Sequence, residues 1–407
     1  MNRRQFLQTT IASCIGLAAY NSRVWAASPS NGNPRFLLIF LRGGYDSANL
    51  LVPYSSDLYY QGRPNIAVPK PSEPNGALEL NSDWALHPSL KDTVLPLYQR
   101  QQAAFVPFAG TADLSRSHFE TQDHIELGQG AHTRDFNSGF LNRLAAVLHD
   151  RARSIAFTNQ LPLSMQGKVR IANQPVVGKI QSMNEAQRQL LEQMYQHSSL
   201  APTVRTAFTT QQQVTEDMAQ MASNGYVAEM IAASRGAINP SGFQAAAAKI
   251  GVLMRDHYNL GFMDLGGWDT HINQTGVTGA EGQLANKFAE LGAGLAVLPD
   301  TMGKAWNETV VVVISEFGRT FRENGNRGTD HGHGSTYWVL GGGVHGGKIV
   351  GEQVALSEKT LNQNRDWPVL TDYRGLLGGL FKRLWGLTPA ELQQVFPDAK
   401  PADLQLV

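Results

Sequence analysis

Residues 309–314 read Thr-Val-Val-Val-Val-Ile, and this run decides the fold class. β-branched residues in succession, with no polar alternation, are typical of a strand buried on both faces of a parallel sheet. Residues 36–41 form a second apolar run, Phe-Leu-Leu-Ile-Phe-Leu. Both runs end at polar or glycine-containing segments, which predicts that each strand leaves the sheet into a loop.

Four further strands are predicted around these two, at residues 103–108, 154–158, 260–265 and 336–340. Helical spacing of apolar residues predicts helices at residues 119–127, 283–298 and 372–385. The sequence Thr388-Pro389-Ala390-Glu391 is a capping box, which opens a last helix. Buried strands that alternate with helices predict an α/β fold, a three-layer sandwich with a mainly parallel central sheet.

Residues 184–258 differ in composition from the chain around them. Gln, Ala, Met and Glu dominate there at helical spacing, and strand formers are few. We predict a helical insertion at this point of a single α/β domain that covers residues 27–407, with ordinary crossover helices as the alternative. The chain of 407 residues is long enough to bury a core of that size.

Residues 1–26 have the pattern of a twin-arginine export signal. An arginine pair at positions 3 and 4 is followed by Phe-Leu at 6–7, an apolar stretch at 11–20 and Val-Trp-Ala at 24–26. The stretch is too short for a membrane span, which needs about 20 apolar residues. We predict recognition by the twin-arginine export machinery and a periplasmic or secreted protein with no transmembrane segment in its mature chain. Cys14 ends a lipobox-like Ile-Ala-Ser-Cys, so a lipid anchor at Cys14 is the alternative.

Charge and cysteine content exclude several classes of function. The formal net charge is +0, which gives no electrostatic basis for binding nucleic acid. One cysteine excludes an intramolecular disulfide framework, a cysteine-rich zinc site and an iron–sulfur cluster. A functional site in this chain is therefore expected to be built from His, Asp and Glu.

Polar clusters follow the predicted strands, at the carboxyl ends where open α/β sheets bind their ligands. The candidate metal ligands in these clusters are Asp46, Asp269, His271, Glu316, Asp330, His331 and His333. The loop 329–334, Thr-Asp-His-Gly-His-Gly, is the strongest signal, because its glycines let the backbone bend until several side chains converge. Imidazole nitrogens and carboxylate oxygens suit a divalent metal ion, and the residues do not distinguish Zn, Mn, Mg, Ca or Fe.

Ser117 is the candidate nucleophile, because it precedes a predicted helix whose N–H groups and dipole favour a bound anion. Ser115 is the alternative nucleophile, and either serine fits a plain N-cap role as well. Arg42, Arg116 and Arg319 are the cations placed to hold an oxyanion with two hydrogen bonds. An ion pair between Arg319 and Glu316 or Glu323 is the alternative for that arginine.

The polar clusters resemble those of a bacterial family, domain-of-unknown-function family 1501, whose members are similar to the alkaline phosphatase and sulfatase superfamily. The matching stretches are Phe40-Leu41-Arg42-Gly43-Gly44-Tyr45-Asp46, Ser115-Arg116-Ser117-His118-Phe119, Gly266-Gly267-Trp268-Asp269-Thr270-His271, Ser315-Glu316-Phe317-Gly318-Arg319 and Thr329-Asp330-His331-Gly332-His333-Gly334. The resemblance implies an alkaline-phosphatase-like fold. It matches Asp46 with the first ligand of the superfamily, Ser117 with the nucleophile region, Asp269 and His271 with an Asp/His pair, and His331 or His333 with the last ligand.

The chain also departs from the superfamily pattern. Glu316-Phe317 stands where a late Asp-His pair would begin, and Phe317 cannot replace a histidine ligand. The spacing between Asp269 and His271 is tighter than usual, and the Cys/Ser-x-Pro-x-Arg motif of formylglycine sulfatases is absent. The resemblance implies an exported metal-dependent hydrolase of phosphate or sulfate esters, acting on a small-molecule or polymer ester. A binding or secretion-associated protein that keeps the fold without catalysis is the alternative, which the Glu316-Phe317 departure favours.

Overall fold

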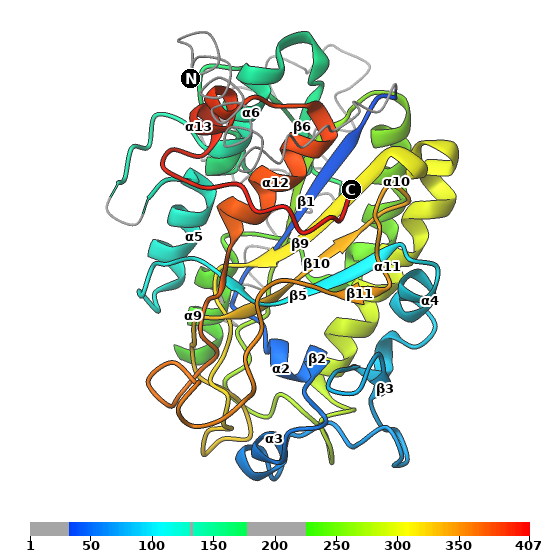
Figure 1. Ribbon diagram of the computed structural model, residues 1–407, viewed down its shortest axis with the longest axis vertical. Helices are drawn as coiled ribbons and strands as arrows, with labels where there is room; N and C mark the ends of the chain where they lie inside the picture. Colours follow the sequence, from blue (N-terminus) through cyan, green and yellow to red (C-terminus); the bar gives the residue numbers. More distant parts are fainter. Residues whose placement is uncertain (1–31, 131–132, 177–224) are drawn as a thin grey trace, which may run out of the picture.

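The computed structural model describes residues 32–130, 133–176 and 225–407 (Figure 1). Its central sheet is built from β1 (Arg35–Leu41), β5 (Ala103–Gly110), β6 (Ser154–Ala156), β7 (Ala172–Asn173), β8 (Leu260–Leu265), β9 (Thr309–Ser315), β10 (Ser335–Leu340), β11 (Lys348–Ile349) and β12 (Thr371–Asp372). The strand order is β11-β5-β10-β9-β1-β8-β6-β7, and β12 pairs with β5. A small second sheet contains β2 (Leu51–Val52), β3 (Leu78–Glu79) and β4 (Ala85–Leu86).

The two runs that decide the fold are neighbours at the centre of this sheet. β1 lies between β9 and β8 and is parallel to both, with Leu38 opposite Val312 and Phe262. All residues of β1 and β9 are buried, as expected for strands covered on both faces. The sheet is open and mostly parallel, which confirms the α/β prediction. β10 is an exception, because it runs antiparallel to both β9 and β5.

Helices cover both faces of the sheet (Figure 1), because successive side chains of each strand point to opposite sides. Leu37, Ile39 and Leu41 of β1 join one apolar core, and Phe36, Leu38 and Phe40 join the other. The helices of the first core are α4 (Val94–Gln99), α10 (Phe243–Asp256) and α11 (Gln283–Met302). Those of the second core are α5 (His118–Leu127), α6 (Phe140–Leu148), α12 (Tyr373–Trp385) and α13 (Pro389–Val395). Short helices α2 (Ser47–Leu50), α3 (Asp57–Gly62) and α9 (Gly225–Ser234) lie in the connections.

The predicted insertion at 184–258 lies partly outside the described residues, which resume at residue 225. From there to residue 258 the chain contains α9 and α10, joined by a connection without α-helix. α10 packs along α11 and buries Phe243, Ile250 and Met254 in the first core, so it serves as a crossover helix that leads into β8. The predicted signal at 1–26 and Cys14 also lie outside the described residues. In the described ranges no helix is both long and apolar enough to cross a membrane.

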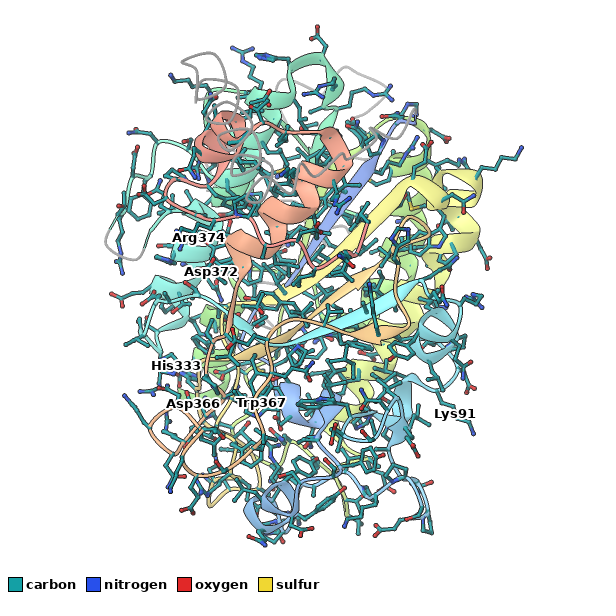
Figure 2. All side chains as sticks on the ribbon, in the orientation of Figure 1. Lys91, His333, Asp366, Trp367, Asp372 and Arg374 are labelled. Carbon is teal, nitrogen blue, oxygen red and sulfur yellow. The ribbon has the colours of Figure 1, made fainter. Side chains whose placement is uncertain are left out.

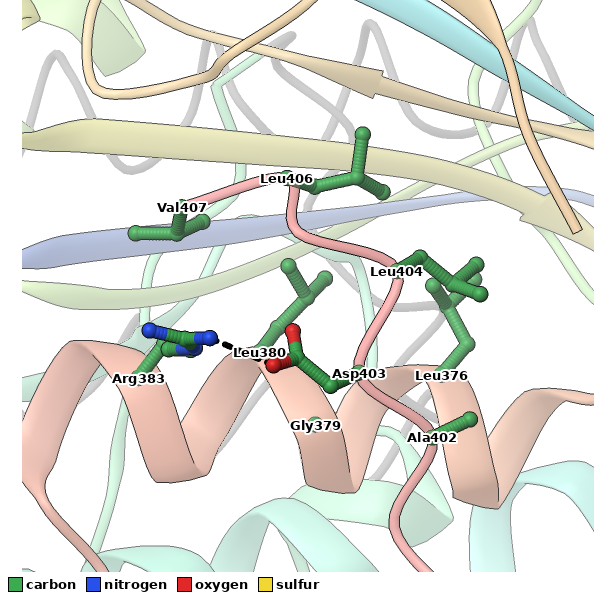
Figure 3. A pocket seen from close by; sticks show the side chains of 9 residues that line it. All are labelled: Leu376, Gly379, Leu380, Arg383, Ala402, Asp403, Leu404, Leu406 and Val407. Carbon is green, nitrogen blue, oxygen red and sulfur yellow. Dashed lines mark hydrogen bonds and ion pairs between the residues drawn. The ribbon is translucent and has the colours of Figure 1, made fainter. Parts of the chain in front are cut away.

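The end of the chain is tied to the second face of the sheet. Thr388 and Glu391 form the predicted capping box at the start of α13. The last residues then run back along α12, where Arg383 pairs with Asp403 (Figure 3). Leu406 is buried in the same core as α12. These contacts order the C-terminal segment against the helix.

His87 is a buried histidine whose protonation is expected to oppose folding. Its ring is fully buried, with Nδ1 accepting from the Ser89 N–H at 3.2 Å and Nε2 lying 2.9 Å from the Gly279 carbonyl. Burial lowers the pKa of His87 from 6.5 to about 4, against the hydrogen bond to Gly279. Because the folded pKa lies below the unfolded one, neutral His87 stabilises the protein above pH 6.5, and this contribution is lost as the pH falls towards 4. We expect His87→Gln to show a smaller fall in unfolding free energy between pH 7 and 4.5 than the wild type, measured by urea unfolding. The exposed His257→Gln is the control, and equal falls in all three proteins would contradict the prediction.

Candidate functional site

The candidate site lies at the carboxyl ends of β1, β9 and β8, as the sequence predicts. These strands are adjacent and parallel, so the loops that follow them meet at one edge of the sheet. Gly43 makes this approach possible: its φ is 123°, and a Cβ there would stand 2.6 Å from the Asp269 backbone nitrogen. Loop 329–334, which precedes β10, and the N-terminus of α5 complete the site.

Three imidazole rings are directed at the carboxylate of Asp269. The distance from His271 Nε2 to Asp269 Oδ1 is 2.9 Å, and that from His331 Nε2 to the same oxygen is 3.2 Å. His118 Nε2 lies 3.4 Å from the other oxygen, Oδ2. His271 Nε2 and His331 Nε2 are 3.0 Å apart. We call Asp269, His118, His271 and His331 the Asp269 cluster.

The opposite side of each ring faces an oxygen acceptor. The Nδ1 atoms lie 2.8 Å from Glu316 Oε1 for His118, 2.9 Å from the Arg116 carbonyl oxygen for His331 and 3.4 Å from Asp330 Oδ1 for His271. A neutral imidazole that donates from Nδ1 presents a lone pair at Nε2. In that tautomer the rings would direct their Nε2 lone pairs at the Asp269 carboxylate, which suits a bound cation. Without a cation, protonated rings instead form hydrogen bonds with that carboxylate. Histidine ligands of metal ions are held in this way by an acceptor behind the ring.

The spacing of the donor atoms fits a small divalent ion. His118, Asp269 and His331 each offer one ligand atom, and these atoms all lie within 4.8 Å of one another. The shortest separations in the Asp269 cluster are 2.9 Å, 3.0 Å and 3.2 Å. Donors in a tetrahedral site with bonds of about 2.0–2.1 Å stand about 3.3 Å apart. The donor set and its spacing therefore fit Zn²⁺ or another nitrogen- and oxygen-binding divalent ion.

Neighbouring charges and hydrogen bonds keep the carboxylates of Asp269 and Glu316 ionised. Burial by itself would raise the pKa of Asp269, but the charge of Arg319 and hydrogen bonds with the histidines outweigh it and hold that pKa well below its usual range. Burial would likewise lower the pKa of His118, yet Asp269 and Glu316 raise it to about 9. Burial also opposes ionisation of Glu316, but its hydrogen bond with His118 prevails and lowers its pKa to about 2. Both carboxylates are therefore negative at neutral pH.

Arg319 positions Asp269 and has no donor left for a substrate. Its side chain is fully buried. Nε donates to the Gly44 carbonyl, and Nη2 donates to the Gly43 carbonyl at 2.6 Å and to Asp269 Oδ1. Nη1 donates to the Thr329 carbonyl at 3.0 Å and also lies 3.4 Å from His271 Nε2. The sequence proposes Arg319 as an oxyanion-binding residue or as a partner of Glu316 or Glu323. The structure corrects both interpretations, because the loop carbonyls and Asp269 occupy the guanidinium.

Asp46 stands apart from the Asp269 cluster, although the sequence makes it a candidate ligand. Arg63 Nη1 donates to Asp46 Oδ2 at 2.6 Å, and Arg63 Nη2 donates to Oδ1 at 3.0 Å. Gln274 Nε2 donates to Oδ2 at 2.7 Å. Both oxygens of this buried carboxylate thus serve an internal ion pair, which corrects the expectation that Asp46 is a ligand.

Glu316 lies behind His118. Its completely buried carboxylate accepts from the Gly43 N–H at 2.8 Å, from Gln122 Nε2 at 2.9 Å and from Ser315 Oγ at 2.9 Å, in addition to His118. Glu316 is thus placed to orient His118 rather than to bind a metal directly. Phe317, where the resemblance expects a histidine, packs its ring 4.9 Å from that of His118.

Asp330 and His333 leave loop 329–334 in different directions. Asp330 is about half exposed, and besides His271 it accepts a hydrogen bond from Asn324 Nδ2 at 3.1 Å. His333 is directed away from the cluster, towards Asp366, with 2.6 Å between Nδ1 and Oδ2. Figure 2 shows His333 and Asp366 together. Of the two histidines in this loop, only His331 is in the cluster.

Ser117 occupies the N-cap position of α5, and its side chain makes no capping hydrogen bond. The hydroxyl of Ser115 is already engaged: it accepts from the Ser117 N–H at 3.2 Å and donates to Glu120 Oε2 at 2.7 Å. Arg116, between the two serines, holds His331 through its backbone carbonyl. The segment therefore leaves the Ser117 hydroxyl more available than that of Ser115.

Sequence reasoning missed His118 as a member of the site. His118 lies in the motif Ser115-Arg116-Ser117-His118-Phe119, where the two serines are the predicted functional residues. A signal exists: His118, Gln122 and Glu126 are spaced by four, so they share one stripe of α5. All three are buried and polar. A buried polar stripe on a helix at a sheet edge indicates partners within the site.

Comparison with known proteins places the chain in a family. A family model described as "Protein of unknown function (DUF1501)" matches residues 33–396, nearly the whole chain. A search of curated proteins finds no match. A solved structure described as "Crystal structure of Ps i-CgsB in complex with k-i-k-neocarrahexaose" is similar at 9% identity and a TM-score of 0.40, covering 91% of this chain and 75% of that chain.

Proposed function

We propose, from the premise that this chain belongs to the DUF1501 family, that the Asp269 cluster binds one divalent metal ion and that the protein hydrolyses phosphate or sulfate esters there. The observation that carries the proposal is the arrangement of three imidazole Nε2 atoms around one carboxylate, each ring with an oxygen acceptor behind it. This pattern supports metal binding because metal-binding histidines are held by such acceptors, and because His118, Asp269 and His331 offer ligand atoms within 4.8 Å of one another.

The residues around the cluster have distinct parts in this proposal. Asp269, His331 and His118 or His271 would hold the ion, and Arg319 keeps Asp269 anionic and in place. When bound, the ion would polarise an ester oxygen and lower the pKa of a bound water or hydroxyl. The carboxylates of Asp46 and Glu316 already accept hydrogen bonds from other residues, so they do not serve as ligands of a second ion. This supports a site for one ion rather than two.

Ser117 is the proposed nucleophile, in preference to Ser115. It sits at the start of α5, where unsatisfied N–H groups and the helix dipole favour the negative charge of a phosphate or sulfate group. Attack by the Ser117 oxygen would form a bond to phosphorus or sulfur and break the bond to the ester oxygen, which would leave as the alcohol with the proton lost by the serine. Water would then cleave the phosphorylated or sulfated serine, releasing phosphate or sulfate and restoring the hydroxyl.

We also propose an alkaline-phosphatase-like fold and a periplasmic or secreted location for this protein. A mostly parallel open sheet with the cluster at its strand ends supports an alkaline-phosphatase-like architecture. The arginine pair and the apolar stretch within residues 1–26 support export through the twin-arginine route to the periplasm or the medium.

Metal content and ester turnover test the proposal. We expect wild type, loaded with Zn²⁺ or Mn²⁺ and then desalted, to retain about one metal ion per chain, measured by plasma mass spectrometry. His331→Ala should retain less than about a tenth of that amount, because it removes a ligand shared by the cluster. The control is His257→Ala, whose side chain is exposed. A panel of aryl and alkyl phosphate and sulfate esters then measures turnover, which we expect to depend on the metal and on Ser117. A wild type that retains no metal under any loading would overturn the proposal.

A second candidate function is metal-dependent binding without catalysis. The cluster offers four donors, and a four-coordinate ion held by all of them has no open position for water or substrate. One retained ion per chain with no turnover of any ester in the panel would favour this candidate over the hydrolase.

A further inference from the structure

We infer that Asp366 and His333 form a positioning pair that holds Arg116 as the binding arm for a tetrahedral oxyanion, phosphate or sulfate, beside the Asp269 cluster. The inference deepens the proposed function and rests on it for the chemistry of the substrate. It also gives His333 a part other than the metal ligation that the sequence suggests.

The His333 ring has partners on both of its nitrogen atoms, and Asn362 Nδ2 lies 2.9 Å from Nδ1. Its Nδ1 lies 2.6 Å from Asp366 Oδ2, and its Nε2 lies 3.3 Å from the Leu114 carbonyl oxygen. Asp366 is completely buried, and Asn362 Nδ2 lies 3.3 Å from its Oδ1. The buried carboxylate thus fixes the ring, and the ring fixes the segment that leads from Leu114 into α5.

Arg116 rests against this pair. Its Nη2 lies 3.4 Å from His333 Nδ1 and 3.8 Å from Asp366 Oδ2, and it donates to Gln363 Oε1 at 3.1 Å. The side chain is 31% exposed, so part of it reaches solvent while Nη2 is supported by these contacts. A guanidinium held at one edge loses less side-chain entropy when an anion binds to it.

Arg116 keeps hydrogen-bonding capacity that the other two arginines of the site have used. Its Nε is buried and makes no hydrogen bond. Arg319 is occupied by backbone carbonyls and Asp269, and Arg42 by Asp264, Gln122 and Glu126. The sequence offers these arginines as equal candidates for an oxyanion, and the hydrogen bonds single out Arg116.

The backbone of Arg116 links this arm to the metal cluster. Its carbonyl oxygen lies 2.9 Å from His331 Nδ1, so one residue contacts the cluster through its backbone and the His333 pair through its side chain. The next residue is Ser117, and His118 follows. An oxyanion bound by Arg116 would therefore lie near the proposed nucleophile and the metal ligands.

Titration with inorganic phosphate and with inorganic sulfate tests the inference. Binding is measured by calorimetry on metal-free and metal-loaded protein. We expect Arg116→Gln to weaken anion binding about tenfold, as for the loss of a charge-assisted bidentate contact. His333→Gln and the milder Asp366→Asn should weaken it about threefold to tenfold, and Arg116→Lys should keep part of the affinity. Arg134→Gln is the control, because that arginine is 48% exposed and pairs with Glu120.

The readouts separate this inference from the proposed function. Retained metal in every variant, with weakened anion binding and a raised KM for any ester turned over, supports the positioning pair. Unchanged anion affinity in Arg116→Gln and His333→Gln would overturn the inference while a metal-dependent hydrolase still stood. Absence of metal binding in wild type would overturn the proposed function, and the anion titrations on metal-free protein would still decide the role of Arg116. Stronger binding of one anion than the other would identify the ester class.

Discussion

Arg42→Met is expected to lower the free energy of unfolding by about 3–5 kcal/mol, because it leaves buried carboxylates without their cation. Arg42 Nε donates to Asp264 Oδ2 at 2.6 Å, and Nη2 donates to Glu126 Oε1 at 2.8 Å. All three side chains are less than a tenth exposed. Met fills much of the same volume, so the loss reflects the uncompensated charges. Urea unfolding at pH 7 measures it.

Two comparisons isolate the cause. Arg255 pairs with Asp256 at 2.7 Å on the surface, and Arg255→Met should change stability far less, because water solvates the remaining carboxylate. Combining Arg42→Met with Asp264→Asn and Glu126→Gln removes the stranded charges and should recover part of the loss. Equal destabilisation by the buried and the surface substitution would show that burial of this charge network is not what matters.

The sequence predicts the strands well because their signal is local. The apolar runs at 36–41 and 309–314 become β1 and β9, the central strands, since a continuous apolar run can be satisfied only by burial on both faces. The reversed direction of β10 is not encoded in that signal. Its run of 336–340 would be equally apolar in either direction, and the orientation depends on the path of the loop before it.

Site residues are harder to predict, because their roles depend on partners distant in the sequence. Asp46 follows a strand as a ligand would, yet Arg63 neutralises it from a loop 17 residues away. Glu316 and His118 are 198 positions apart and meet only because α5 begins at the end of β9. His271 and His331, two of the candidate ligands from the sequence, both contact Asp269. Position at a strand end therefore predicts which residues lie near the site. The contacts that each side chain makes there depend on the fold.

Asp269→Asn is expected to lower affinity for a divalent metal ion more than 100-fold in the folded protein. Loss of a residue that only supports a ligand costs about 10–100-fold, and Asp269 is the acceptor around which all three rings are arranged. The amide keeps the shape of the side chain but removes its charge, and its N–H group would oppose a cation. The same change leaves the buried guanidinium of Arg319 without its charged partner, so metal-free Asp269→Asn should also unfold about 3 kcal/mol more easily.

Asp330→Asn is the matched control, since it makes the same substitution in a half-exposed carboxylate that lies 3.4 Å from His271 Nδ1, behind the ring. Its effect on affinity should stay near the lower end of that range, about tenfold, because solvent already screens its charge. Competition with a chromophoric chelator measures affinity, and urea unfolding without metal measures stability. If Asp269→Asn bound metal as tightly as Asp330→Asn does, the ion would lie elsewhere and the cluster would be an internal network of hydrogen bonds around Arg319. Loss of stability without loss of metal affinity would lead to the same conclusion, because the guanidinium would then be the cation that the three rings and Asp269 enclose.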